Sequence, residues 1–218
     1  MDLEEFNTTS DLIQDFGAEK SLNVEEAVRI AWNNYRKLEN EFFKENQELH
    51  SYFSNPNYWY KLIRFLHYHI FNGVYTNNGS FRKNIDPNYG KVSFGKQSNR
   101  EIKMQFDGTI PNEIEAKIED ICIKFTNNQI ESKLDRVIRF YQQFVKIHPF
   151  YDGNGRVGRI ITNHFLIQQS GESLNWADFD SKRSFIKKLN YAHKSDNIEP
   201  LVKYCSKYLF QYIGNEDF

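Results

Sequence analysis

Apolar side chains recur every three or four positions along much of the chain, which predicts a protein built mainly of helices. In the clearest example, residues 134–145, this spacing places the apolar side chains on one helix face. They belong to Leu134, Val137, Ile138, Tyr141, Phe144 and Val145. The same spacing reaches His148, and Pro149 then predicts the end of the helix, because proline lacks an N–H and disfavours helical geometry in the preceding residue. We therefore expect His148 at a helix end, with its side chain directed inward.

The same periodicity predicts further helices on both sides of this segment. They cover residues 24–46, 58–71, 111–127, 154–170 and 199–212, and one more begins at Asp180 or Ser181 and includes Ala192. Pro111 and Pro200 lie in first turns, where proline is tolerated. Gly171 lies where a left-handed residue often closes a helix. The predicted fold is an all-α helical bundle.

Residues 83–109 break the helical pattern. Gly90, Gly95 and Gly108 separate short runs in which residue types alternate, such as Lys91–Phe94. Alternation between glycine-containing turns is typical of a β-hairpin. We therefore expect one small hairpin in this region, and no other strand in the chain.

Composition and charge exclude several classes of protein. Among the 218 residues, 28 Lys and Arg stand against 29 Asp and Glu, so the overall charge does not predict nucleic-acid or membrane binding. Aromatic residues make up 16% of the chain, which predicts a core rich in rings. No apolar stretch approaches the length that crosses a bilayer.

Cellular location is indicated by the cysteines and by the start of the chain. Cys122 and Cys205 lie in predicted helices far apart in sequence, which suits buried thiols in a reducing compartment. The acidic start Met1–Glu5 lacks the apolar run of a secretory signal. We expect a cytoplasmic protein, while delivery as an effector by a route that needs no signal peptide stays open.

Chemically reactive residues are concentrated in residues 148–159, which read His-Pro-Phe-Tyr-Asp-Gly-Asn-Gly-Arg-Val-Gly-Arg. The Gly153–Gly155 segment lies at a predicted helix start, where free backbone N–H groups and the helix dipole bind phosphate. Arg156 and Arg159 are one helical turn apart, and guanidinium groups donate paired hydrogen bonds to phosphate oxygens. Asp152 offers a hard oxygen ligand for Mg²⁺ on the same phosphates. The segment is therefore predicted to bind a polyphosphate with its metal.

His148 adds a base to this segment. Its ordinary pKa of about 6.5 suits it to accept a proton from an attacking hydroxyl at neutral pH, so the site predicts phosphoryl or nucleotidyl transfer to an alcohol. Each residue also has a structural explanation: His148 as a helix cap, Asp152 and Asn154 as turn residues, and the arginines as solvated charges. Their joint occurrence favours the functional interpretation.

The segment matches the signature His-x-Phe-x-Asp/Glu-Gly-Asn-Gly-Arg-x-x-Arg at every specified position, and the chain thus resembles the Fic (filamentation induced by cAMP) family. The resemblance implies a Fic-fold helical bundle in which the hairpin at 83–109 is a flap that aligns a target segment by main-chain pairing. It also divides the chain into an N-terminal lead-in and helix (1–56), a Fic domain (57–212) and a C-terminal tail (213–218).

The activity implied by this resemblance is protein adenylylation. AMP would move from ATP to a Ser, Thr or Tyr hydroxyl of a target protein, with release of pyrophosphate. By motif match, His148 would deprotonate the hydroxyl, and Asp152 would hold Mg²⁺ between the α- and β-phosphates. Phe150 would anchor the loop in the core.

The phosphate ligands are likewise implied by motif match. Asn154 and the N–H groups around Gly153 and Gly155 would hold the α-phosphate. Arg156 would bind the β-phosphate, and Arg159 would bind the γ-phosphate.

A second part of the resemblance lies in Asn77-Asn78-Gly79-Ser80-Phe81-Arg82. Many family members have Trp-Ala-Gly-x-x-Arg here, so this chain keeps the glycine and the arginine but not the tryptophan and alanine. We expect this corner of the molecule to affect local packing and not the motif chemistry. Nearby, His67 and His69 lack carboxylate or thiol partners at ligand spacing, so we expect core or surface histidines rather than a metal site.

Many Fic enzymes carry an inhibitory helix with the pattern Ser/Thr-x-x-x-Glu-Gly/Asn, whose glutamate pairs with the second motif arginine. The intact pattern is absent from this sequence. A separate inhibitory, antitoxin-like protein, a degenerate helix within residues 1–50, and the lack of such control are the three alternatives. Glu39 is the first candidate for a degenerate inhibitor, against the simpler interpretation of a solvated charge.

Two alternatives to adenylyl transfer are carried forward. A same-fold enzyme with other chemistry would transfer phosphocholine or the γ-phosphate, or remove AMP. The retained Gly153–Arg156 segment disfavours the kinase-like branch, and the missing inhibitory glutamate disfavours AMP removal. The other alternative is a non-enzymatic nucleotide-binding module, against which the intact His148 argues, because binding alone needs no base.

Overall fold

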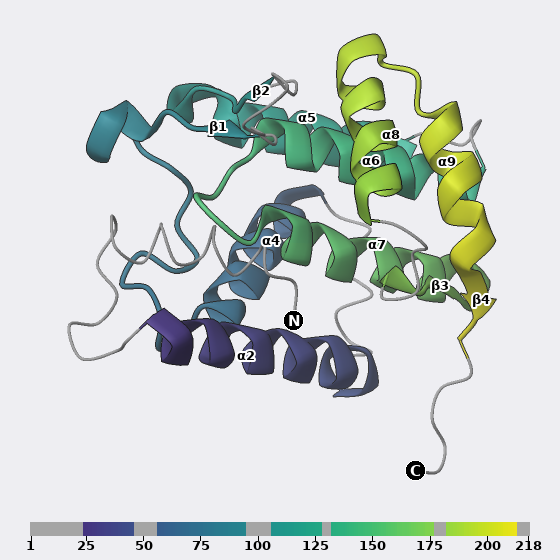
Figure 1. Ribbon diagram of the computed structural model, residues 1–218, viewed down its shortest axis with the longest axis horizontal. Coiled ribbons are helices and arrows are strands. Elements are labelled where there is room, and N and C mark those ends of the chain that lie inside the picture. Colours follow the sequence, from purple (N-terminus) through teal and green to yellow (C-terminus); the bar gives the residue numbers. More distant parts are fainter. Residues whose placement is uncertain (1–23, 46–55, 95–105, 128–131, 177–181, 213–218) are drawn as a thin grey trace.

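The computed structural model describes residues 24–45, 56–94, 106–127, 132–176 and 182–212. Helices account for most of them: α2 (Val24–Glu45), α4 (Pro56–Ile70), α5 (Ile114–Asn127), α6 (Lys133–Ile147), α7 (Asn154–Ser170), α8 (Lys182–Ser195) and α9 (Glu199–Cys205), with short 3-10 turns at Pro87–Gly90, Pro111–Glu113 and Ser206–Tyr208. The strands are β1 (Ser93–Phe94), β2 (Phe106–Asp107), β3 (Glu172–Leu174) and β4 (Leu209–Gln211). The predicted all-α bundle is confirmed (Figure 1).

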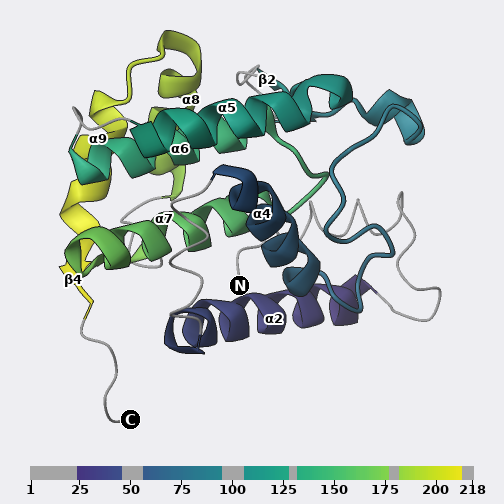
Figure 2. The same ribbon diagram turned by 180° about the vertical axis from the view of Figure 1, so that it is seen from behind.

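Helix α7 lies in the middle of the molecule (Figures 1 and 2). The layer formed by α5 and α6 lies on one side of it, and helix α2 lies on the other. Helix α6 packs against α5, α7, α8 and α9, whereas α4 packs against α5, α7 and α2. The core between them is rich in rings, as predicted. Trp59 of α4 stacks on Phe165 of α7 at 4.5 Å between ring centroids and meets Phe140 of α6 edge-on at 5.1 Å. These rings fix α6 and α7 side by side.

The ends of α6 and α7 follow local signals in the sequence. Ser132 caps the start of α6 by accepting a hydrogen bond from the Asp135 N–H (3.1 Å). At the other end, His148 adopts a left-handed conformation with φ 53°. Helix α7 begins at Asn154 after Gly153 (φ 74°), and Gly171 (φ 66°) closes it. The predicted position of His148 at a helix end is confirmed.

The flap consists of an antiparallel pair in which Ser93 lies opposite Asp107 and Phe94 opposite Phe106. Its connection, residues 95–105, lies outside the described residues. Two backbone hydrogen bonds fix the base of the flap: the Gly108 N–H donates to Val92, and the Thr109 N–H donates to Ile147 at the end of α6, both at 3.0 Å. The hairpin predicted within 83–109 is therefore present and attached to the helix that carries His148.

A second strand pair corrects two predictions. Helix α9 ends at Cys205 rather than near Tyr212, and β4 pairs with β3 in antiparallel register from Leu209 opposite Leu174 to Gln211 opposite Glu172. The flap is thus not the only strand signal of the chain. Helical spacing of apolar residues at 199–212 also fits a short helix followed by a short strand, and only the distant partner decides between them.

Two further expectations concern the chain as a whole. Cys122 and Cys205 are both buried and free, as predicted. In the described residues, no helix combines the length and the apolar character that a membrane span requires.

Candidate active site

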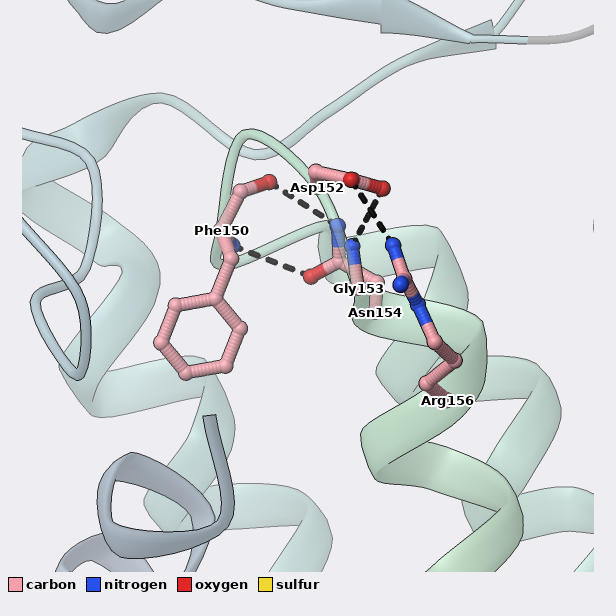
Figure 3. A network of polar contacts seen from close by, with 5 residues as sticks. All are labelled: Phe150, Asp152, Gly153, Asn154 and Arg156. Atoms are coloured by element: carbon pink, nitrogen blue, oxygen red, sulfur yellow. Dashed lines mark hydrogen bonds and ion pairs between the residues drawn. The ribbon is translucent and has the colours of Figure 1, made fainter. Parts of the chain in front are cut away.

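The loop between α6 and α7 is held by Phe150 and Asn154. The Phe150 ring is buried and stacks on His67 of α4 at 3.8 Å between centroids. Asn154 accepts a hydrogen bond from the Phe150 N–H (3.0 Å) through Oδ1 and donates one to its carbonyl (2.9 Å) through Nδ2 (Figure 3). The Asn154 side chain thus shapes the loop in this structure, and its role in holding the α-phosphate stays a prediction.

Gly153 is required by its surroundings. Its φ of 74° is a left-handed conformation, and a Cβ atom here would lie 2.4 Å from Cε2 of Phe71. The Gly153 N–H donates to Oδ1 of Asp152 at 2.6 Å. Because the first N–H groups of a helix lack intrahelical acceptors, the start of α7 attracts anions. The predicted phosphate-binding segment thus lies at a helix start, and its role in binding phosphate stays a prediction.

Asp152 and Arg156 bind each other at the start of α7. Oδ2 of Asp152 lies 2.8 Å from Nη2 of Arg156, and the arginine side chain is only 1% exposed (Figure 3). The Arg156 guanidinium also lies over the rings of Phe71 (4.8 Å) and Trp32 (5.6 Å). The structure thus brings together the residues predicted to bind the metal and the β-phosphate.

Helix α2 reaches the second motif arginine as well. The guanidinium of Arg159 lies 5.8 Å from the ring centre of Tyr35. Rings of α2 therefore cover both motif arginines, Arg156 through Trp32 and Arg159 through Tyr35. The sequence predicted a helix over residues 24–46 but neither of these contacts. The side chain of Glu39, the predicted candidate inhibitor, lies outside the described residues.

The hydrogen bond of the His148 ring and its pKa indicate which ring nitrogen can accept a proton. Nδ1 lies 3.3 Å from the carbonyl oxygen of Val145. Since a carbonyl only accepts hydrogen bonds, Nδ1 carries the hydrogen, and the lone pair is on Nε2. Desolvation by burial, with the positive charge of Arg82, lowers the pKa of His148 to about 4. His148 is therefore a neutral base at pH 7.

Flap residues hold the imidazole of His148 from another side. The Phe94 ring stacks on it at 4.5 Å between centroids, with 10° between the planes. A Cβ atom added to Gly108 would lie 3.2 Å from the His148 Cβ. The flap base therefore fits closely against His148.

Arg82 is a buried residue that sequence reasoning did not assign to the site. Its Nε donates to the His148 carbonyl (2.8 Å), and Nη2 donates to the Thr109 carbonyl (2.7 Å). Nη1 donates to the carbonyl of Gly90. Burial lowers the Arg82 pKa to about 10, so the side chain remains charged at neutral pH. Arg82 ties the end of α6 to the flap.

The contacts of Arg82 correct one expectation. The corner at Asn77–Arg82 was expected to leave the motif chemistry untouched, but the arginine that it retains extends to the backbone of His148. Its retained glycine, Gly79, adopts φ 72°, and its N–H donates to Nδ1 of His67 at 2.9 Å. This part of the family pattern supports the motif directly.

His67 is a core histidine, which is one of the two positions expected for it. It is buried against Phe150 and accepts the hydrogen bond from Gly79. Burial lowers its pKa to about 3, so its ring is neutral.

Comparison with known proteins agrees with the fold described above. The fold resembles BepC, a VirB-translocated effector of Bartonella tribocorum solved with bound AMPPNP (TM-score 0.63, 14% identity, 89% of this chain and 91% of that chain). It also resembles a Fic family protein from Desulfovibrio desulfuricans (TM-score 0.60, 18% identity, 95% and 57%). In sequence, the chain is 26% identical over 117 residues to protein adenylyltransferase fic-1 of Caenorhabditis elegans, covering 50% of this chain but only 22% of that relative.

The family model described as Fic/DOC matches residues 52–166, which is more than half of the chain. The matched range contains α4, the flap and the whole motif from His148 to Arg159. The chain therefore belongs to the Fic/DOC family.

Proposed function

We propose that this protein is an adenylyltransferase that moves AMP from ATP to a Ser, Thr or Tyr hydroxyl of a target protein and releases pyrophosphate. The observation that carries this proposal is the neutral His148, which offers the lone pair of Nε2 next to the anion-attracting start of α7. The adenylyltransferase name of a relative and the AMPPNP bound to a structural neighbour also support it.

In the proposed reaction, the target hydroxyl donates its proton to Nε2 of His148. The hydroxyl oxygen forms a bond to the α-phosphorus, and the bond between that phosphorus and the bridging oxygen of pyrophosphate breaks. Charge accumulates on the leaving pyrophosphate, where Arg156 and Arg159 would stabilise it. The start of α7 would hold the α-phosphate through its backbone N–H groups.

The residues present fit Mg²⁺ bound together with the nucleotide. Mg²⁺ is commonly held by one or two carboxylates and substrate phosphates, and the Asp152 carboxylate lies at the helix start that would bind those phosphates. In the described part of the chain, no group of three or more possible ligands forms a preformed metal site. Bound Mg²⁺ would offset phosphate charge, and Asp152 would hold it. The β-phosphate would then replace Asp152 as the anionic partner of Arg156.

The flap is proposed to recognise the target, and helix α2 is proposed to take part in control. A target segment would pair with the main chain of the flap beside His148. For control, a separate inhibitory protein and a degenerate internal helix are both retained as proposals. The contacts of Trp32 and Tyr35 with the motif arginines favour the internal helix.

Label transfer from ATP tests the proposed function. We expect label from the α-phosphate, and none from the γ-phosphate, to reach the protein itself or proteins of a cell lysate. His148→Ala should lower this transfer about 100- to 10,000-fold by removing the base, while nucleotide binding is kept. His69→Ala, which removes a histidine of α4 outside the motif, is the matched control.

Two outcomes would overturn the proposal. Transfer of label from the γ-phosphate would indicate a kinase. Undiminished α-label transfer by His148→Ala would mean that another group is the base.

A further inference from the structure

A pocket of about 530 Å³ lies beside the flap and has no role in the proposed chemistry. Its walls come from the segment Asp107–Ile110, the first half of α5, the last part of α6, and Asp196 after α8. Gly108 lines this pocket and also lies close to the side chain of His148. One residue thus borders both the pocket and the proposed base.

The pocket has an excess of carboxylates: it is lined by Asp107, Glu113, Asp120 and Asp196 but only by Lys117 and Lys146. Lys117 pairs with Glu113 at 2.9 Å, and Asp120 pairs with Lys124 at 2.6 Å. The Lys146 ammonium donates to the His193 carbonyl at 3.0 Å. These contacts pair Lys117 with Glu113 and Lys124 with Asp120, whereas Lys146 keeps its positive charge, because a carbonyl is neutral.

The remaining two carboxylates belong to Asp107 in β2 and Asp196 at the junction of α8 and α9. Asp107 accepts a hydrogen bond from the Ser93 hydroxyl (2.6 Å), which does not neutralise its charge. Within the described residues, neither carboxylate has a cationic partner. Two negative charges thus come from different walls of one pocket.

Gln142 provides an independent observation. It lines the pocket and is fully buried, and its Nε2 lies 2.9 Å from Nδ1 of His193. Its Oε1 has no hydrogen-bond partner within the described part of the chain. A buried polar atom without a partner is unfavourable, so a hydrogen-bond donor that reached this oxygen from the pocket would be stabilising.

Two carboxylates and an amide oxygen call for a cation that carries several N–H donors. A guanidinium group fits best, because its donors are arranged to bind more than one oxygen at a time. Lysine offers the same charge with fewer directed donors.

We propose that this pocket binds a basic side chain of the target protein, preferably arginine, a few residues from the hydroxyl that is modified. The identity of the ligand rests on the proposed function, since it takes the target to lie at the flap. Extended chain advances by about 3.3 Å per residue, so a nearby residue of a segment at the flap reaches the pocket beside Gly108.

The first experiment measures binding and does not depend on AMP transfer. Nα-acetyl-arginine methylamide and its neutral citrulline analogue are titrated into ¹⁵N-labelled protein, and amide shifts are followed. We expect the arginine probe alone to shift Gly108 and Gln142, and binding to weaken as salt is raised.

Variants identify the residues involved. Asp107→Asn and Asp196→Asn should each weaken binding of the arginine probe about tenfold, as expected for loss of a charged hydrogen-bond partner. Asparagine tolerates the left-handed backbone of residue 196 (φ 58°). Glu119→Gln, which removes a charge from the exposed side of α5, is the matched control and should bind as the wild type does. Equal binding of the citrulline probe, or unchanged binding by both aspartate variants, would overturn the proposal.

The second experiment identifies modified sites in a lysate labelled from the α-phosphate of ATP. We expect arginine or lysine close to the modified hydroxyls, and Asp107→Asn with Asp196→Asn should abolish that preference. Modified sites without a basic neighbour, despite binding of the probe, would mean that the pocket takes a free cationic molecule, which contradicts the proposal. Absence of any labelled protein would instead overturn the proposed function, while the binding experiment still decides whether the pocket is cationic.

Discussion

The guanidinium of Arg82 donates to backbone carbonyls of His148, Thr109 and Gly90. Its role therefore cannot be found by searching the sequence for an oppositely charged partner, because every residue carries a carbonyl. In the sequence, Arg82 was noticeable only as the arginine that the chain shares with the family pattern at residues 77–82. The individual residues of the motif were recognisable because their chemistry lies within twelve consecutive positions.

The pH dependence of the reaction tests the environment of His148. Burial and Arg82 disfavour the imidazolium form and lower the pKa to about 4. As pH falls, Nε2 should therefore keep its lone pair until the pH approaches that value. We expect kcat/KM for AMP transfer to be constant from about pH 8 to about pH 5 and to fall as the pH approaches 4.

Initial rates of label transfer across this pH range provide the measurement. Arg82→Met should move the fall in kcat/KM to higher pH, because it removes the positive charge, whereas Arg82→Lys keeps the charge. The folded content of both variants is checked by circular dichroism. A midpoint near the ordinary histidine pKa of about 6.5 in the wild type would contradict the prediction.

Among the secondary-structure elements, α6 and α7 were predicted closely, because proline and glycine mark their ends and one apolar face runs along α6. The pair β3 and β4 was not predicted. Each strand has three residues, and Asn163 of α7 fixes β3 by bonding both backbone groups of Leu174 at 3.1 Å. Such pairing depends on contacts between distant segments, which local periodicity does not contain. For the same reason, the contacts of α2 with the motif arginines were missed.

The start of α7 offers a matched pair of glycine substitutions. Gly153→Ala should lower the free energy of unfolding by at least about 2 kcal/mol, because it combines a left-handed backbone with overpacking against Phe71. Gly155→Ala should change it by less than about 1 kcal/mol, because alanine suits the helical backbone of the first turn and the nearest atom to its Cβ, the Tyr141 hydroxyl, lies 3.7 Å away.

Urea unfolding of both variants measures the difference, and nucleotide binding is measured in parallel. We expect Gly153→Ala to bind ATP more weakly as well, because the loop that precedes α7 must move. Equal stability of the two variants would show that Phe71 yields without cost and that the left-handed conformation is not required.

Within the described residues, burial lowers the pKa of His67 to about 3 and the pKa values of His148 and His193 to about 4, so these rings are neutral at pH 7. Their unfolded pKa is about 6.5, so the unfolded chain binds more protons. Stability is then fully present above about pH 6.5 and is lost as pH falls towards 4. Between pH 7 and pH 5, the free energy of unfolding should therefore fall by about 2 kcal/mol for each of these histidines.

Urea unfolding at pH 7 and pH 5 measures this loss. His193→Gln removes one titrating group and keeps a side chain that can bond Gln142. Between pH 7 and pH 5, the free energy of unfolding of His193→Gln should fall by about 2 kcal/mol less than that of the wild type, whatever the stability of the variant at pH 7. An equal loss in both proteins would mean that His193 is protonated as readily in the folded state as in the unfolded state.

The bond from Arg82 to His148 joins residues that are 66 positions apart in sequence. During folding, α6 and α7 form from neighbouring residues, but contacts between distant segments must await closure of the chain between them. The backbone that carries the base is therefore completed late, after residues 82 and 109 have met the end of α6. A chain that is still being synthesised or refolded already contains the whole motif but does not yet hold its base in place. If the proposed AMP transfer is the activity of this chain, we therefore expect it to be gained in the last steps of folding.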